Sequence, residues 1–478
     1  MTSASGYLAR IESNEFPCDD LRVTGFTGRE AISEPFSFDI DLVRLGADAL
    51  PSAAGPGARL TLVLEGPDGE PRRLHGMVER LKDRLSAVPD HRAYRLRLVP
   101  RVARLGFVET QEIHLDRSVP EIIEHKLSQV GLTGGDVEMR LSGSYPPREF
   151  VVQYRESDLA FVSRLGEHVG LSYFFRHEED ADVVVFTDGR FDRRAGRALP
   201  YDQGRDHAAV FELDVESAMA PDLFAVQDYN YRHPLAEMWA SHTLDEGTGG
   251  GVVEYGTHHK SKAEGDTLAR VRAEERRAAA RVFEGKSRIP ALAAGVVTSL
   301  DGHPLLDTIH LLPTEVRHVF RQNDAESAPA GYSNAFRAVP ADVPYRTPRR
   351  TPKPRIAGVV TAVVQPPPGG KLGGRAWIDD HGRYTVAFHF DASPAKPRPS
   401  RPIRMAQPYV GPDQGMHFPL RAGAEVVVAF LDGDPDRPVI LGAVPNTITP
   451  SPVTAATSDK HRITTGNGAI IFEMGHGK

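Results

Sequence analysis

Apolar and polar side chains alternate through roughly the first 110 residues, a period of two that predicts strands. Within residues 36–41 the apolar members fall on one face and the polar members on the other: Phe36, Phe38 and Ile40 against Ser37, Asp39 and Asp41. Segments 58–66 and 93–102 repeat this period, and the Asp68–Gly69 pair is typical of a hairpin turn. The N-terminal region is therefore predicted to consist of strands.

Three segments instead repeat apolar residues every three or four positions, which predicts helices at 118–132, 154–171 and 262–281. Ser118 and Glu121 have the spacing of a capping box for the first helix. The predicted inner positions of the three helices are Val119, Ile122, Ile123, Leu127 and Val130, then Leu159, Val162, Leu165 and Val169, then Leu268 and Val271. Strands, two short helices and more strands follow one another, so we expect an α+β region rather than a doubly wound fold.

The composition changes after Ser327, where six prolines up to Pro354 predict an extended linker without regular elements. Residues 355–447 then contain five short strand patterns separated by Gly and Pro turns, which is typical of a small closed barrel such as an OB fold. One of these patterns is residues 402–410. In the clearest one, Tyr384, Val386, Phe388 and Phe390 share one face, opposite Arg383, Thr385, Ala387 and His389. Residues 448–478 carry too little apolar surface to form a core alone.

Charge and cysteine content narrow the possible functions. The 478 residues have a formal net charge of −7, with Lys and Arg spread along the chain, whereas a nucleic-acid binder needs a concentrated basic face. A single cysteine, Cys18, excludes an internal disulfide and a cysteine metal cluster. The N-terminus lacks the pattern of a signal peptide, and no apolar run approaches membrane-spanning length. We therefore expect synthesis and folding in the cytoplasm.

Three aspartates at alternate positions, Asp432, Asp434 and Asp436, are the most conspicuous candidate site. A calcium loop starting at Asp432 would need Gly at its sixth position and Glu at its twelfth, where this chain has Arg437 and Ala443. Catalytic carboxylates would need a cleft that perturbs their pKa values. Asp-Gly and two prolines between apolar strands instead predict a turn whose aspartates are solvated and paired.

Other candidate motifs fail on their spacing. Residues Glu284–Ser287 lack the first glycine of a phosphate loop, and Ser333 lacks the final glycine of a nucleophile elbow, which predicts a loop serine. The adjacent His258 and His259 would point to different sides, so we expect a surface or interface role. His476 could meet two copies of itself on a threefold axis, which is a metal-site hypothesis. No catalytic, cofactor-binding or metal-binding residue is assigned.

Several long motifs together resemble the VgrG family, the spike tips of type VI secretion systems, and related phage-tail-like injection particles. The motifs that carry this resemblance are "GFTGREAISEPFSFDIDL", "QYRESDLAFVSRLGEHVGLSYFF", "RYTVAFHFD", "MAQPYVG" and "VVVAFLDGDPDRPVILGAVPN". They occur in the family's order and cover nearly the whole chain. The resemblance implies a mainly β chain with four parts: a tail-hub-like domain of two barrels with helical insertions (1–345), a proline-rich linker (346–354), an OB-fold domain (355–447) and the start of a trimeric β-helical stalk (448–478).

The resemblance also implies a mechanical function. Such a protein is a homotrimer that docks on a hexameric, Hcp-like inner tube, meets baseplate proteins, carries a PAAR-type tip protein and effectors, and touches the target membrane transiently. It binds no nucleic acid, is not an enzyme and needs no cofactor. It would leave the cytoplasm as part of the injected tip.

Two alternatives come from other functional classes. A cell-wall-degrading spike enzyme would need a domain carrying two carboxylates after the barrel, and Val444 is followed within a few residues by the predicted stalk. A saccharide- or nucleic-acid-binding OB module would need exposed aromatics for stacking. In the clearest strand pattern, the outer face offers few side chains for such binding, among them Arg383 and His389. The aromatic residues of that strand share the other face.

Overall fold

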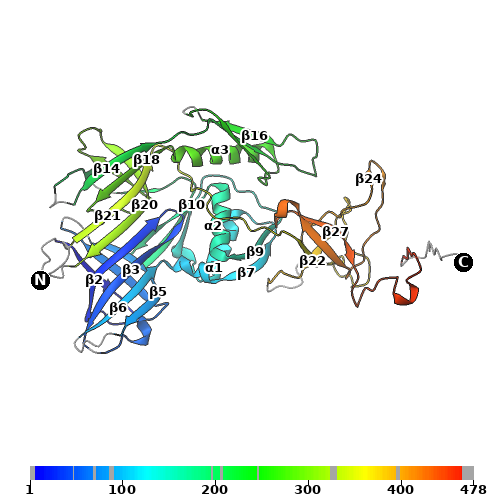
Figure 1. The fold of residues 1–478 in the computed structure, drawn as a ribbon, viewed down its shortest axis with the longest axis horizontal. Helices are drawn as coiled ribbons and strands as arrows, with labels where there is room; N and C mark the ends of the chain where they lie inside the picture. The colour runs from blue at the N-terminus through cyan, green and yellow to red at the C-terminus, as the bar shows by residue number, and fades with distance from the viewer. Residues whose placement is uncertain are drawn as a thin grey trace. The chain divides into compact units, whose positions relative to one another are not determined.

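The computed structural model describes residues 6–465 except 47, 68–70, 86–90, 195–197, 205–207, 245–246, 323–330 and 394–398 (Figure 1). The chain forms two compact units. The N-terminal unit comprises residues 1–108, 119–145 and 158–352, and the C-terminal unit comprises 109–118, 146–157 and 353–478. Within the described part of the chain, no helix is both long and apolar enough to cross a membrane.

Six strands open the N-terminal unit in the order β1-β4-β5-β6-β3-β2. Their bounds are β1 Leu8–Glu12, β2 Leu21–Ala31, β3 Glu34–Leu45, β4 Arg59–Glu65, β5 Arg72–Arg84 and β6 His91–Val99. The predicted alternation is confirmed, since Phe36, Phe38 and Ile40 are at most 1% exposed. Gly28 pairs with Phe38, and a Cβ at Gly28 would lie 2.1 Å from that ring, so only glycine leaves room for it. The β4–β5 pair is antiparallel as expected, while Asp68–Gly69 lies outside the described residues.

The same sheet continues from β2 into a second set of strands in the order β20-β21-β18-β14. The strands are β14 Val210–Ser217, β18 Arg281–Ser287, β19 Val296–Asp301, β20 Ile309–Arg321 and β21 Gly331–Pro340, with the short β12 Asp192–Arg193 and β13 Leu199–Pro200 on β19. A second apolar core lies here, formed around Leu300, Val316 and Phe336. The expectation that prolines exclude regular structure from 327 to 354 is wrong for β21, because Pro340 only ends that strand.

The three predicted helices are present as α1 Val119–Gln129, α2 Asp158–Val169 and α3 Lys262–Ala278. In α1 the predicted face is buried except for Val130, which lies beyond the helix end. In α2, Val162 and Leu165 are buried while Leu159 and Val169 are only partly covered. The backbone N–H of Glu264 donates to the side chain of Ser261, which caps the start of α3.

Two smaller sheets complete the N-terminal unit. Helix α3 packs on the sheet β16-β15-β17, whose strands are Trp239–Thr243, Leu223–Gln227 and Gly251–Tyr255. The sheet β10-β11-β8 contains Ser172–Glu178, Ala181–Thr187 and Val137–Arg140. Short 3-10 helices occur at Ser52–Ala54, Arg101–Phe107, Gly134–Asp136, Leu431–Gly433 and Ala455–Thr457, the last two in the C-terminal unit.

The extended segment after β21 is fastened to the N-terminal unit. The Arg346 guanidinium donates to the carbonyls of Gly170 (3.0 Å) and Asp188 (2.7 Å) and pairs with Glu274. The Thr347 hydroxyl lies 2.8 Å from the Ser172 hydroxyl. The chain therefore runs through this proline-rich stretch without helix or strand but with buried polar anchors.

A four-stranded sheet, β23-β22-β26-β27, builds the C-terminal unit (Figure 1). Its strands are β22 Val359–Val364, β23 Val386–Phe388, β26 Glu425–Phe430 and β27 Pro438–Val444. Tyr384, Val386 and Phe388 are buried and Phe390 is partly buried, as predicted. The predicted strand at 402–410 is largely wrong. Ile403 and Met405 make only isolated bridges there, and Val410–Gly411 (β24) pairs with Gln414–Gly415 (β25) in a separate two-stranded ribbon.

The C-terminal unit also contains an antiparallel pair from far upstream, β7 Glu109–His114 and β9 Val151–Ser157. Ile113 and Val152 belong to the same apolar core as the four-stranded sheet. Beyond β27, the described residues 448–465 contain the 3-10 helix Ala455–Thr457 and no strand longer than a single bridge residue. The stalk at 448–478 stays a prediction, and its last part, with His476, lies outside the described residues.

Candidate functional site

The three aspartates lie on the turn between β26 and β27, which pair antiparallel from Glu425↔Val444 to Phe430↔Pro438. Backbone hydrogen bonds close the turn, with the Leu431 N–H donating to Arg437 and the Asp434 N–H donating to Leu431. Asp432 is exposed and has a left-handed backbone with φ of 54°. The predicted turn between two strands is confirmed.

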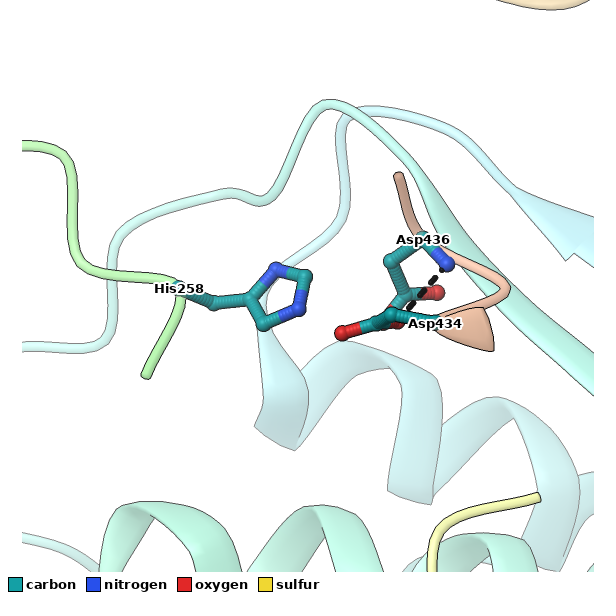
Figure 2. A group of neighbouring side chains, drawn as sticks. All are labelled: His258, Asp434 and Asp436. Carbon is teal, nitrogen blue, oxygen red and sulfur yellow. Dashed lines mark hydrogen bonds between the residues drawn. The ribbon is translucent and has the colours of Figure 1, made fainter. Parts of the chain in front are cut away.

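Two of these aspartates form a clasp with Lys353. The Lys353 Nζ lies 2.6 Å from Asp434 Oδ1 and 2.7 Å from Asp436 Oδ2. The other oxygen of Asp436 accepts the backbone N–H of Val152 at 2.7 Å. Figure 2 shows Asp434 and Asp436 with the hydrogen bond that the Asp436 N–H donates to Asp434 Oδ1 (3.0 Å). We call Lys353, Asp434, Asp436 and the Val152 amide the acidic clasp.

The clasp corrects one expectation about the aspartates. They are paired as predicted, but Asp436 is not solvated, since its side chain is only 3% exposed. Its negative charge is balanced by an ammonium group and a backbone donor, which is how buried carboxylates are tolerated. The Lys353 ammonium group is the positive charge that pairs with the carboxylates of both Asp434 and Asp436. His258 is drawn in the same view but belongs to the N-terminal unit and is not a member of the clasp.

The aromatic residues of the clearest predicted strand, Tyr384, Phe388 and Phe390, pack in or against the core of the barrel. Tyr384 is 1% exposed, its hydroxyl lies 2.6 Å from His417 Nε2, and it accepts the Leu420 N–H. On the outward set, Arg383 is paired with Asp379 and His389 is exposed. These positions give no stack of aromatic rings on which bases or sugars could lie.

The adjacent histidines have different surroundings. His259 is 3% exposed, with Nε2 2.8 Å from the Met238 carbonyl and Nδ1 2.8 Å from the Thr257 hydroxyl. The expected surface role is therefore wrong for His259, which is a hydrogen-bonded core residue. His258 is half-buried, has a φ of 64°, and its N–H donates to Asp228. Both ring nitrogens of His259 are already engaged with protein oxygens.

The two failed motifs lie on strands. Residues Glu284–Ser287 are in β18, where no loop could surround a phosphate. Ser333 is exposed on β21, so the expectation of a loop serine is wrong. A nucleophile elbow needs a strand-to-helix turn, and Ser333 lies within a ten-residue strand.

A buried ionic cluster in the N-terminal unit was not anticipated from the sequence. Arg72 Nη2 lies 2.5 Å and His318 Nε2 lies 2.9 Å from Glu30 Oε1. Burial would raise the pKa of Glu30, but Arg72 and His318 outweigh it and lower that pKa to about 2. Burial also lowers the pKa of His318, and it lowers that of the neighbouring His177 to about 3. The alternation within β2 could have indicated that Glu30 points inward. Alternate residues of a strand lie on one side, and Glu30 is on the same side as Phe26 and Gly28.

Two family models match the chain in sequence. The phage tail baseplate hub (GPD) model matches residues 29–324, and the type VI secretion system/phage-baseplate injector OB domain model matches residues 357–444. The hub model alone covers more than half of the chain. The first match lies almost entirely within the range of the N-terminal unit and the second within the C-terminal unit.

Individual relatives agree with the family models. The type VI secretion system spike protein VgrG5 of Pseudomonas aeruginosa is 33% identical over 463 residues, which cover 89% of this chain and 56% of VgrG5. VgrG1a of the same species is 30% identical over 463 residues, covering 92% of this chain and 70% of VgrG1a. This chain thus spans only a little more than half of VgrG5.

A solved structure gives the same result. The E. coli c3393 protein is described as a type VI secretion component with structural similarity to the T4 bacteriophage tail proteins gp27 and gp5. It superposes with a TM-score of 0.67 at 25% identity and covers 91% of this chain and 99% of its own. With a hub region followed by an OB-fold region, at these levels of identity, the chain belongs to the VgrG family of type VI secretion spike proteins.

Proposed function

We propose that this chain forms the hub and proximal spike of a homotrimeric tip on a contractile injection tube. The observation that carries the proposal is the fusion of two modules in one chain, because the hub and injector OB models match in that order. A hub attaches to a tube and a spike meets the target. A chain that contains both can pass thrust from one to the other without a separate adaptor.

Exposed apolar residues on the sheet β16-β15-β17 support an oligomer. Helix α3 covers one face of this sheet, while Trp239, Val253 and Tyr255 on the other are 37%, 59% and 60% exposed. Trp239 and Tyr255 flank Gln227 in register. Grouped apolar side chains on a surface are typical of interaction sites.

The partners follow from the proposed position in the machine. The hub region, taken as residues 1–345, would dock on a hexameric inner tube and contact baseplate proteins. After a linker at 346–354, the OB region at 355–447 would lead into a trimeric β-helical stalk that begins at 448. A PAAR-type tip protein and effector cargo would attach beyond this point, and the whole tip would leave the bacterial cytoplasm as part of the injected particle.

The proposed action is mechanical, with no chemical turnover. Contraction of the machine would push the tip through the target envelope, and resistance to deformation would come from strands whose hydrogen bonds break together. The carboxylates of the acidic clasp are engaged with Lys353 and Val152, which supports a structural role for this turn.

Mass photometry of the purified chain, followed by cryo-EM, tests the trimer. We expect a particle of about three times the 52.3 kDa chain mass with threefold symmetry. In cells, deletion of the gene should abolish release of the inner tube protein into the medium. A monomer that clears peptidoglycan in a zymogram would contradict the proposal and favour a cell-wall hydrolase.

A further inference from the structure

Part of the C-terminal unit is encoded inside the sequence of the N-terminal unit. Residues 109–118 and 146–157 belong to the C-terminal unit, although residues 119–145 between them belong to the N-terminal unit. Each inserted segment requires the chain to leave and return, and the chain leaves again after Pro352. The chain therefore passes between the two units five times, two for each segment and one more.

The inserted segments contribute to the core of the C-terminal unit. They pair with each other as β7 and β9, and Ile113 and Val152 are 3% and 0% exposed among the barrel core residues. The Phe150 ring lies 6.3 Å from Phe388, and Tyr154 makes an edge contact with Phe390 at 5.4 Å. Without this strand pair, the buried side of β23 would lose aromatic partners.

A backbone hydrogen bond and a side-chain ion pair add to this apolar packing. The Ala392 N–H donates to the Gln111 carbonyl at 2.7 Å, and Arg401 forms an ion pair with Asp116. Both contacts join an inserted segment to the part of the barrel that follows β23. Polar contacts of this kind fix the register of the pair relative to the barrel, which apolar packing alone does not.

The acidic clasp joins three parts of the chain at one carboxylate. Asp436 accepts the N–H of Val152 in β9, pairs with Lys353 at the first residue after the last crossing, and itself lies on the β26–β27 turn. Because the Asp436 side chain is 3% exposed, water cannot readily replace either partner. Asp434 contacts the same ammonium but has a more exposed side chain, at 15%.

We propose that the β7–β9 pair folds and unfolds with the C-terminal unit, and that Asp436 is the positioning residue that fastens it there. The barrel recognised by the OB model, residues 357–444, is then incomplete without the two upstream segments. The mechanical consequence rests on the proposed function. Axial force between hub and spike is shared by five chain crossings, two of which directly adjoin β7 or β9, instead of passing through one linker.

Hydrogen exchange of the full-length chain, followed by mass spectrometry, tests which unit holds the strand pair. Val428→Ala creates a cavity in the barrel core and Leu98→Ala creates one in the N-terminal core, since both side chains are fully buried. We expect Val428→Ala to speed exchange in 109–114, 151–157 and 425–444 by a common factor, on the order of tenfold. Leu98→Ala should speed exchange in 36–43 and leave β7 and β9 unchanged. Ile440→Val is a milder substitute if Val428→Ala does not fold.

The opposite pattern would overturn the assignment. If exchange in β7 and β9 speeds up in Leu98→Ala, or equally in both variants, the strand pair does not unfold with the C-terminal unit alone. Asp436→Asn should speed exchange at 151–157 several-fold. Asp432→Asn, on the exposed side of the same turn, should leave that exchange unchanged. Equal effects of the two substitutions would show that Asp436 does not fasten the strand pair. None of these readouts depends on secretion or on the trimer, so the proposed function can fail while this inference stands.

Discussion

The first sheet of the N-terminal unit and the four-stranded sheet of the C-terminal unit differ in what they bury. The first sheet of the N-terminal unit places Glu30, Arg72 and His318 together, with Glu30 and His318 at 7% and 2% exposure. The four-stranded sheet of the C-terminal unit packs around an apolar cluster, in which the Tyr384 hydroxyl is hydrogen-bonded. The C-terminal unit buries its ionisable groups outside that cluster, with Glu112, His114 and Glu156 in β7 and β9 and the Asp436 side chain on the β26–β27 turn.

This difference predicts two kinds of sensitivity. An ionic cluster taken out of water is costly to form and more costly to break, because removal of one partner leaves a charge without compensation. An apolar core is indifferent to pH but does not accept a charge. The first sheet should therefore respond to the loss of a charge, and the apolar cluster of the four-stranded sheet to the gain of one.

Val428→Asp should give the largest effect. Val428 is 0% exposed in β26, whereas its neighbour Val427 faces the other side of the strand and is only partly buried. An aspartate at 428 would have no partner in the apolar core, so we expect a loss of more than about 4 kcal/mol in the unfolding free energy of the C-terminal unit. The chain has two tryptophans, and a Trp239→Phe background leaves Trp377 to report on this unit alone in urea unfolding.

Val427→Asp is the matched control for this substitution. It adds the same charge one residue away and should cost far less. Equal losses from the two variants would show that the sides of β26 are not distinguished by burial, which would remove the basis of the comparison.

Arg72→Met should give the next largest effect, now in the N-terminal unit. It leaves Glu30 buried beside His318 without its arginine, and we expect a loss of about 3 kcal/mol at pH 7. A Trp377→Phe background leaves Trp239 as the reporter. Arg73→Met is the neighbouring control, because the ion pair of Arg73 with Glu12 is more than a third exposed and should contribute less than about 1 kcal/mol. If Arg72→Met leaves the unfolding free energy of the N-terminal unit unchanged, the ionic cluster adds nothing to stability.

Alternation predicted the strands well where every buried position is apolar, as at Phe36, Phe38 and Ile40. It gave no reason to place Glu30 inside, although Glu30 shares the side of Phe26 and Gly28, because a glutamate is rarely buried unless a partner is present. It also missed β21, because proline was taken as a breaker along the whole segment. A proline at the last position of a strand, such as Pro340, does not interrupt the pairing before it.

The acid response of the N-terminal unit should be smaller than the effect of Arg72→Met but specific in sign. Burial lowers the folded-state pKa of His177 to about 3, from an ordinary value near 6.5, so the unfolded chain takes up its proton first as pH falls. Stability should therefore be full above pH 6.5 and fall below it, by up to about 1.4 kcal/mol per pH unit for this group. His318 and His75, whose pKa values are also lowered by burial, act in the same direction.

His177→Asn tests this response, because an asparagine oxygen can still accept the His75 N–H that His177 Nδ1 accepts. Urea unfolding at pH 7, 6 and 5 in the Trp377→Phe background should show a shallower loss for the variant than for its parent. Parallel pH profiles would contradict a neutral, buried His177.

The acidic clasp could be predicted from the sequence only in part. Asp-Gly and the flanking prolines indicated the turn, because turn preferences are local. The partners of Asp436 are not local, since Lys353 and Val152 are 83 and 284 residues away in sequence. Nothing in the pattern around Asp436 distinguishes it from Asp432, and only the packing of β9 against the turn buries one of them.

Asp436→Asn should give the smallest measurable effect and decides whether the clasp adds stability. The amide oxygen can still accept the Val152 N–H, but the charge that pairs with Lys353 is lost, so we expect about 1 kcal/mol of destabilisation in the C-terminal unit. Asp432→Asn, on the exposed side of the same turn, should change stability by less than about 0.5 kcal/mol. Because Coulomb attraction is screened by ions, the difference between the two variants should shrink only slightly in high salt if Asp436 is as buried as its 3% exposure indicates. A difference that vanishes at 1 M salt would instead place the Lys353–Asp436 pair among ordinary surface ion pairs, which contribute little to stability.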